Sequence, residues 1–143
     1  MHQIYNNEND YAWQKKGKEG TKQVSANTGR RRLNIFWALN PLSYEVTSII
    51  TEANCDIESM KVFFSEIRKE YGEKPITIFL DNARYQRAYE TQDHAKNLNI
   101  TLEFLPPYSP NLNLIERLWK FTKKKCFKNR YYEDFQTFEK TVK

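Results

Sequence analysis

One apolar run constrains the fold of this chain more than any other feature. Residues 76–80 read ITIFL, follow a proline, and end abruptly at Asp81 and Asn82. Four of these five residues are apolar, and such a run is typical of a strand that is buried on both faces of a sheet. Residues 86–98 then have the pattern of a helix, and residues 100–105 that of a second strand. This order predicts a parallel pair of strands joined by a right-handed crossover.

The segments around this unit predict one α/β domain, because 143 residues make about one domain on a prior of roughly 100–200 residues each. Residues 32–40 and 44–51 are rich in β-branched and aromatic residues and flank an Asn-Pro turn, which predicts a hairpin. Apolar residues at helical spacing predict helices at 56–71, before Gly72, at about 113–128, after the turn PPYSPN, and at 132–142, and a short strand is expected at 11–15.

Composition excludes several classes of protein. No stretch approaches the roughly 20 apolar residues that span a bilayer, and the first ten residues lack the apolar core of a signal peptide. Cys55 and Cys126 stand apart, without a CxxC motif or a histidine-rich neighbourhood, so neither a zinc site nor a disulfide framework is indicated. We therefore expect a cytoplasmic protein with no membrane partner.

Charge is segregated along the chain. Lys and Arg outnumber Asp and Glu by 7 to 3 in residues 1–32 and by 9 to 3 in residues 117–143, whereas the middle of the chain has 7 basic and 12 acidic residues. Basic surfaces attract the phosphates of DNA or RNA, and clustered carboxylates hold cations. The combination suggests a nuclease-like enzyme, although solvated lysine-rich helix faces are an ordinary alternative.

Two carboxylates are candidates for a shared metal site. Asp81 follows a buried strand, at the edge where open α/β sheets place their ligands. Glu116 lies 34 residues further on, an interval that accommodates a helix, a strand and a turn and so returns the chain to the same edge. Carboxylate oxygens suit Mg²⁺, and two carboxylates with a third group can hold two metal ions about 3.5–4 Å apart against one phosphodiester.

Each candidate residue has a structural alternative. Asp81 could simply end its strand in an Asx turn with Asn82, and Glu116 could occupy the third position of a capping box that starts at Asn113. The candidate DNA contacts are the basic residues Arg30, Arg31 and Arg32, which could also be the solvated start of a strand, and Lys120, Lys123 and Lys124, which share a predicted helix face with Glu116.

Four segments, WQKKGKEG, NTGRRRLNIFWALN, FLDNARYQRA and LPPYSPNLNLIERLWKFTKKK, together resemble bacterial insertion-sequence transposases of the DDE superfamily, in the branch related to mariner elements. The resemblance covers almost the whole chain. It implies a ribonuclease-H-like mixed sheet flanked by helices and three carboxylates that use Mg²⁺ or Mn²⁺ to cut transposon ends and join them to target DNA. Asp81 matches the second carboxylate and Glu116 the third.

The chain departs from the family pattern at its start. A family-like alignment would put the first carboxylate about two residues before Met1, and Asp10 lacks the apolar run that would qualify it for that role. The family's helix-turn-helix region, which recognises transposon ends, is also missing. We therefore expect residues 1–143 to form a single, incomplete catalytic domain with a truncated first strand.

The sequence thus predicts a transposase catalytic domain that is inactive alone, binds transposon-end and target DNA, and could form a transposase homo-oligomer. The alternative is a noncatalytic DNA-binding module or a remnant that inhibits full-length transposase. A third possibility is that another polypeptide supplies the first strand.

Overall fold

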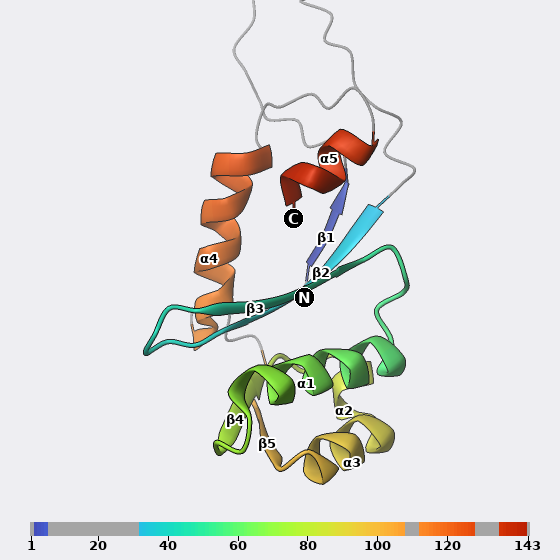
Figure 1. Ribbon diagram of the computed structural model, residues 1–143, viewed down its shortest axis with the longest axis vertical. Helices are drawn as coiled ribbons and strands as arrows, with labels where there is room; N and C mark the ends of the chain where they lie inside the picture. The colour runs from blue at the N-terminus through green and yellow to red at the C-terminus, as the bar shows by residue number, and fades with distance from the viewer. Residues whose placement is uncertain (1, 6–31, 108–111, 128–134, 143) are drawn as a thin grey trace, which may run out of the picture.

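The computed structural model describes residues 2–5, 32–107, 112–127 and 135–142 of the chain (Figure 1). The strand expected at residues 11–15 lies outside these ranges. Within them the chain has the predicted α/β character, with antiparallel strands first and a parallel pair later.

Three antiparallel strands form the first sheet in the order β1 (His2–Tyr5), β2 (Arg32–Leu39) and β3 (Val46–Thr51). The β2–β3 ladder runs from Asn34 opposite Thr51 to Leu39 opposite Val46. Asn40 closes the turn, since its backbone N–H donates to the Glu45 carbonyl at 2.9 Å and its carbonyl accepts from the Tyr44 N–H at 2.8 Å. The predicted hairpin is confirmed.

The parallel pair is also confirmed. β4 (Ile76–Leu80) and β5 (Ile100–Phe104) run side by side from Ile76 opposite Ile100 to Leu80 opposite Phe104. The single helix expected between them is instead two helices, α2 (Arg84–Arg87) and α3 (Tyr89–Asn97). Ala88 separates them with an extended ψ of 143°, and the Thr91 hydroxyl donates to the Tyr85 carbonyl at 2.7 Å across the break.

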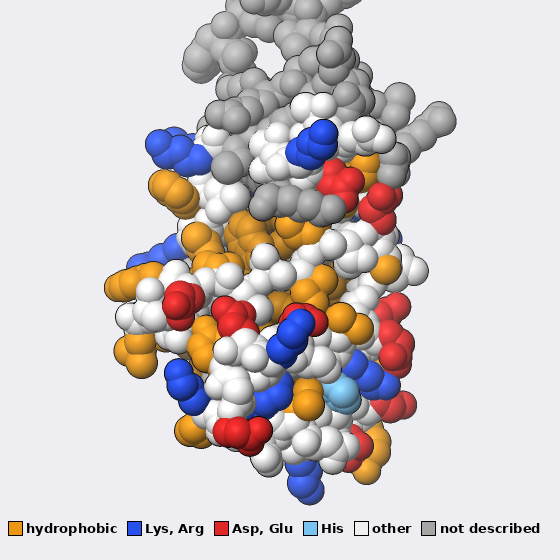
Figure 2. Space-filling model, viewed as in Figure 1, with side chains coloured by type: hydrophobic (Ala, Val, Ile, Leu, Met, Phe, Trp, Pro, Cys, Tyr) orange, Lys and Arg blue, Asp and Glu red, His pale blue; other side chains and the backbone are white. Residues whose placement is uncertain are grey.

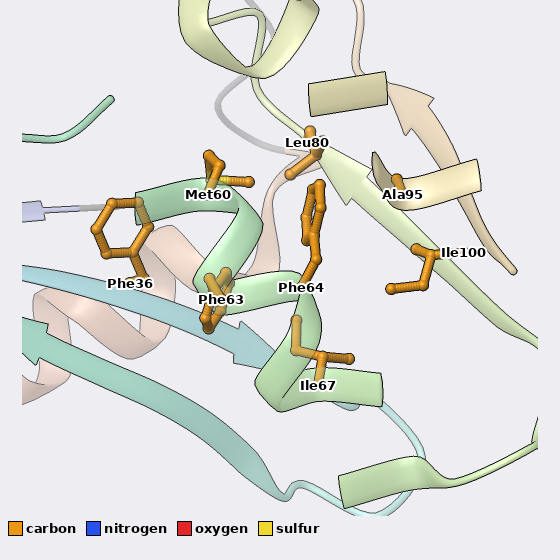
Figure 3. Close-up of a cluster of buried hydrophobic side chains, with 8 residues drawn as sticks. All are labelled: Phe36, Met60, Phe63, Phe64, Ile67, Leu80, Ala95 and Ile100. Carbon is orange, nitrogen blue, oxygen red and sulfur yellow. The ribbon is translucent and has the colours of Figure 1, made fainter. Parts of the chain in front are cut away.

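Helix α1 (Ile57–Tyr71) joins the two sheets through one apolar cluster. Asp56 begins the helix by accepting from the Ser59 N–H at 2.9 Å, and Gly72 ends it with a φ of 58°, a value that favours glycine. Figure 3 shows Leu80, the last residue of β4, beside the Phe64 ring of α1. The buried residues of this cluster are Phe36, Met60, Phe63, Phe64, Ile67, Leu80, Ala95 and Ile100.

A second cluster covers the other face of β2. It contains Leu33 and Ile35 of β2, Trp119 of α4 (Leu114–Thr122), and Phe135 and Phe138 of α5 (Phe135–Val142). Alternate residues of β2 therefore enter different clusters, as the period of a strand requires. In Figure 1, α4 and α5 lie on the side of the first sheet away from α1.

One face of the parallel pair is open, which corrects the expectation that residues 76–80 are buried on both faces. Thr77 and Phe79 of β4 and Thr101 and Glu103 of β5 are exposed, and the Phe79 side chain is 67% exposed. The opposite face packs on α1 and α3 through residues such as Leu80 and Ile100. The run is apolar except at Thr77, and its apolar residues alone do not show whether another element covers the second face.

The predicted α/β class, with antiparallel and parallel strands and flanking helices, is confirmed. The described residues nevertheless form two separate ladders, because no hydrogen-bonded pairing joins the three-stranded sheet to the β4–β5 pair. β1 lies at the end of the first ladder and has four residues. None of the described helices is long and apolar enough to cross a membrane.

Candidate active site

Asp81 occupies the edge that the sequence predicts for it. It directly follows β4, and its side chain is exposed. The two strands are parallel and their ladder continues beyond β5, where the Leu105 N–H donates to the Leu80 carbonyl at 2.9 Å. The carboxyl ends of both strands therefore meet beside Asp81, where an exposed carboxylate can reach a cation.

The side chain of Asn82 ties these two strand ends together. Its Nδ2 donates to the Leu105 carbonyl, and its Oδ1 accepts from the Arg87 guanidinium, with Nε at 2.8 Å and Nη2 also in contact. The Arg87 Cζ in turn lies 4.6 Å from the centroid of the Phe104 ring. Sequence reasoning considered Asn82 only as part of an Asx turn and assigned Arg87 no role; the amide directly after a strand-end aspartate was the available signal.

Tyr85 lies close enough to Asp81 for the carboxylate charge to affect its pKa. Burial first, and then the negative charges of Asp81 and the Cys55 thiolate, raise the pKa of Tyr85 to about 12. The tyrosine hydroxyl therefore stays protonated at neutral pH. Sequence analysis did not identify this neighbour, because its proximity depends on the helix α2 that turns back from Asp81.

Glu116 lies in the first turn of α4 and is half-buried. Asn113 caps this helix, since its Oδ1 accepts from the Ile115 N–H at 3.2 Å. That bond confirms the helix start on which the structural alternative for Glu116 depends, but a position in the first turn is equally compatible with metal binding. Along the chain, α4 follows β5 and Leu105, so Glu116 comes after the strand end that lies beside Asp81.

The two carboxylates fit a hard divalent cation by the chemistry of their oxygens. Mg²⁺ is commonly held by one or two carboxylates together with water and substrate phosphates, and Asp81 is open to such ligands. No group of three or more His, Cys, Asp or Glu side chains that could hold a metal occurs among the residues that the structure describes. By the type of their oxygens, Asp81 and Glu116 are suited to part of such a coordination shell.

The candidate DNA contacts differ in their surroundings. Arg30 and Arg31 lie outside the described residues, whereas Arg32 begins β2 and donates to the Asn54 Oδ1 at 3.2 Å. Lys120 and Lys124 are exposed. On the face of the molecule that Figure 2 shows, the Lys and Arg side chains form separate spots among Asp and Glu. The described part of that face therefore has no continuous basic surface.

Lys123 differs from the other two lysines in its surroundings. The α-helix ends at Thr122 and continues as a π-helical turn, η3 (Lys123–Phe127). Lys123 is half-buried, and its Nζ lies 5.5 Å from the centroid of the Trp119 ring. Trp119 itself is a core residue, 4% exposed.

Solved structures of a mariner transposase resemble this fold. A pre-cleavage Mos1 transpososome matches with a TM-score of 0.74 and 12% identity, and a Mos1 mariner paired-end complex with Mn matches with a TM-score of 0.73 and 12% identity. Each match covers 99% of this chain and 45% or 44% of the Mos1 chain. At such identity the likeness shows the fold alone, which is the predicted ribonuclease-H-like class.

Two comparisons at the level of sequence, with a relative and with a family model, bear on the family. An uncharacterised protein of Sinorhizobium fredii, y4pE/y4sA, is 34% identical over 82 residues, which are 57% of this chain and 58% of that protein. The chain thus spans less than two thirds of the relatives that it matches. The family model described as DDE superfamily endonuclease matches residues 3–139. Because that match includes nearly the whole sequence, both predicted carboxylates among it, the chain belongs to the DDE superfamily endonuclease family.

Proposed function

We propose that residues 1–143 form one catalytic domain of a DNA transposase, which cuts DNA at transposon ends and joins the ends to target DNA. One observation carries the proposal: an exposed aspartate stands at the carboxyl edge of the parallel strands, inside a chain that belongs to the DDE endonuclease family. The solved Mos1 structures are transposase complexes, one with a left transposon end. This likeness favours DNA as the partner of this chain as well.

Asp81 and Glu116 are assigned as ligands of Mg²⁺ or Mn²⁺. When bound, the cation supplies charge neutralisation at the phosphate and lowers the pKa of water. Asp81 contributes an exposed carboxylate on a fixed strand end, and Glu116 contributes a second carboxylate from the first turn of α4. Lys120 and Lys124, with Arg32 and Lys123 at less exposed positions, would contact the DNA backbone by charge.

The resemblance to DDE transposases implies three carboxylates, and Asp81 and Glu116 are proposed as two of them. We therefore propose that DNA cleavage needs a further carboxylate and that this chain does not nick DNA alone. The paired-end form of the Mos1 complexes supports a homo-oligomer as the working assembly. A noncatalytic or inhibitory remnant remains the alternative function.

The test is nicking of supercoiled plasmid by the chain with an added amino-terminal strand. The extension ends in Asp two residues before Met1, and a matched extension ends in Ala. We expect the Asp form to nick DNA in the presence of Mn²⁺ and the Ala form only to gain thermal stability. If the unextended chain, free of contaminating nucleases, nicks DNA and loses this activity with Asp81→Ala, the requirement for an added carboxylate is wrong. If no form nicks DNA but all bind it, the noncatalytic alternative is correct.

A further inference from the structure

Asp81 is held on both sides, although its own side chain is exposed. On the amino-terminal side, the Leu80 carbonyl accepts from the Leu105 N–H at 2.9 Å. On the carboxyl-terminal side, the Asn82 amide donates to the carbonyl of the same residue, Leu105. The backbone that carries Asp81 is thus attached to the end of β5 immediately before and immediately after the aspartate.

Arg87 fixes the orientation of the Asn82 amide. Two guanidinium nitrogens contact Asn82 Oδ1, so Nδ2 is the atom directed at Leu105. The guanidinium also lies over the Phe104 ring, 4.6 Å from its centroid, which restricts the rotamers of the arginine. These interactions connect α2, the end of β4 and the end of β5 around an aspartate whose own side chain is exposed.

We propose that Asn82, oriented by Arg87, is a positioning residue for Asp81. This inference rests on the proposed function, because it assigns Asn82 a role only if Asp81 binds a cation. A carboxylate on a fixed backbone samples fewer positions before it binds the cation, so less conformational freedom is lost on binding. Groups that orient metal ligands in this way change metal affinity by about 10–100-fold when they are removed.

A comparison of two arginines distinguishes the positioning role from a simple effect of charge. Arg84 and Arg87 lie on the same short helix, and both are exposed, but only Arg87 contacts Asn82. Removal of a positive charge near a cation site should strengthen cation binding or leave it unchanged. A weaker site after Arg87→Gln, alongside an unchanged or stronger site after Arg84→Gln, can therefore not be an effect of charge.

The experiment measures Mn²⁺ affinity by water-proton relaxation in the parent and in the Asn82→Ala, Arg87→Gln and Arg84→Gln variants. We expect about a tenfold or greater loss for the first two variants and none for the third. Hydrogen exchange of the Leu105 amide is read in the same samples, and it should become faster in the first two variants only. If Asn82→Ala unfolds the protein, Arg87→Gln decides the question, because it changes an exposed side chain.

Asp81→Asn separates failure of this inference from failure of the proposed function. If Asp81→Asn binds Mn²⁺ as the parent does, Asp81 is not a ligand, and both the metal site and the positioning role are wrong. If Asp81→Asn loses binding while Asn82→Ala and Arg87→Gln keep the parent affinity, the metal site stands and the positioning role is overturned. Equal losses in Arg84→Gln and Arg87→Gln would also overturn it.

Discussion

The two ends of the β4–β5 pair are held together by different means. At the amino-terminal end, Arg68 of α1 reaches into both loops that precede the strands and donates only to backbone carbonyls. These are the carbonyls of Leu98, Gly72, Lys74 and Asn99, at 2.7, 2.5, 2.7 and 2.7 Å. At the carboxyl-terminal end, the amide of Asn82 makes the connection between the strands, and it leaves Asp81 exposed beside it.

Within this strand pair, the amino-terminal end contributes to stability and the carboxyl-terminal end carries the candidate metal ligand. Arg68 uses its planar set of donors to bind four backbone carbonyls, and all of them lie at the end of the strands away from Asp81. Asn82 and Arg87 satisfy fewer groups but surround the candidate metal ligand. We infer that changes at the amino-terminal end affect folding, whereas changes at the carboxyl-terminal end affect the proposed site.

The largest expected effect is at the amino-terminal end. Arg68→Ala removes all four hydrogen bonds and should lower the free energy of unfolding by about 2 kcal/mol, because water can replace only part of the missing bonding. Arg68→Lys should recover part of this stability, since lysine keeps the charge but lacks the planar fork. Urea denaturation measures both variants. If Arg68→Ala leaves stability unchanged but weakens Mn²⁺ binding, the division between the two ends is wrong.

A smaller change, in DNA affinity, is expected when the lysines of α4 and η3 lose their charge. Changing Lys120, Lys123 and Lys124 to Gln should weaken binding equally for all sequences. It should also flatten the slope of log affinity against log salt by about 0.9 for each DNA phosphate that the variant no longer neutralises. The control variant removes the same charge near the amino-terminal end of the strands, at the exposed residues Lys69, Lys74 and Lys96. The same slope change in both variants would mean that the α4 lysines are only a solvated surface.

The smallest effect is confined to alkaline pH. Because the folded state favours neutral Tyr85, its pKa is about 12 in the fold against 10.0 as the ordinary value. This tyrosine therefore stabilises the fold fully below pH 10, and the contribution is lost as the pH rises from about 10 to 12. Tyr85→Phe should lose less stability than the parent over this range. Tyr89→Phe, at a side chain that is 79% exposed, should follow the parent; equal behaviour of the two variants would contradict the assignment.

Local sequence signals predicted most of the elements of this fold. Apolar residues at helical spacing and Gly72 define α1, the Asn-Pro turn defines the hairpin, and the interval between two apolar runs defines the parallel pair. Each of these features depends on residues that are close in sequence, so propensity and periodicity are sufficient to recognise it.

Features that depend on distant contacts were not predictable. The break at Ala88 has neither Pro nor Gly to signal it and is stabilised by bonds such as Thr91 to Tyr85. The exposure of Phe79 depends on what covers the open face of β4, and a strand's own residues do not report that. Asp81 and Glu116 were recognisable as candidates, whereas the network of Asn82, Arg87 and Leu105 required the register of two strands.

The central claim is that Asp81 and Glu116 bind one divalent cation at the carboxyl edge of the parallel strands. The direct test is calorimetric titration of Mn²⁺ into the parent, Asp81→Asn and Glu116→Gln proteins, with folding confirmed by thermal denaturation. We expect the parent to bind and both variants to lose binding while they remain folded. A shared site would bring two negative charges together, and these repel each other, so either substitution should leave metal-free stability unchanged or higher. Equal Mn²⁺ binding in all three folded proteins would contradict the shared site.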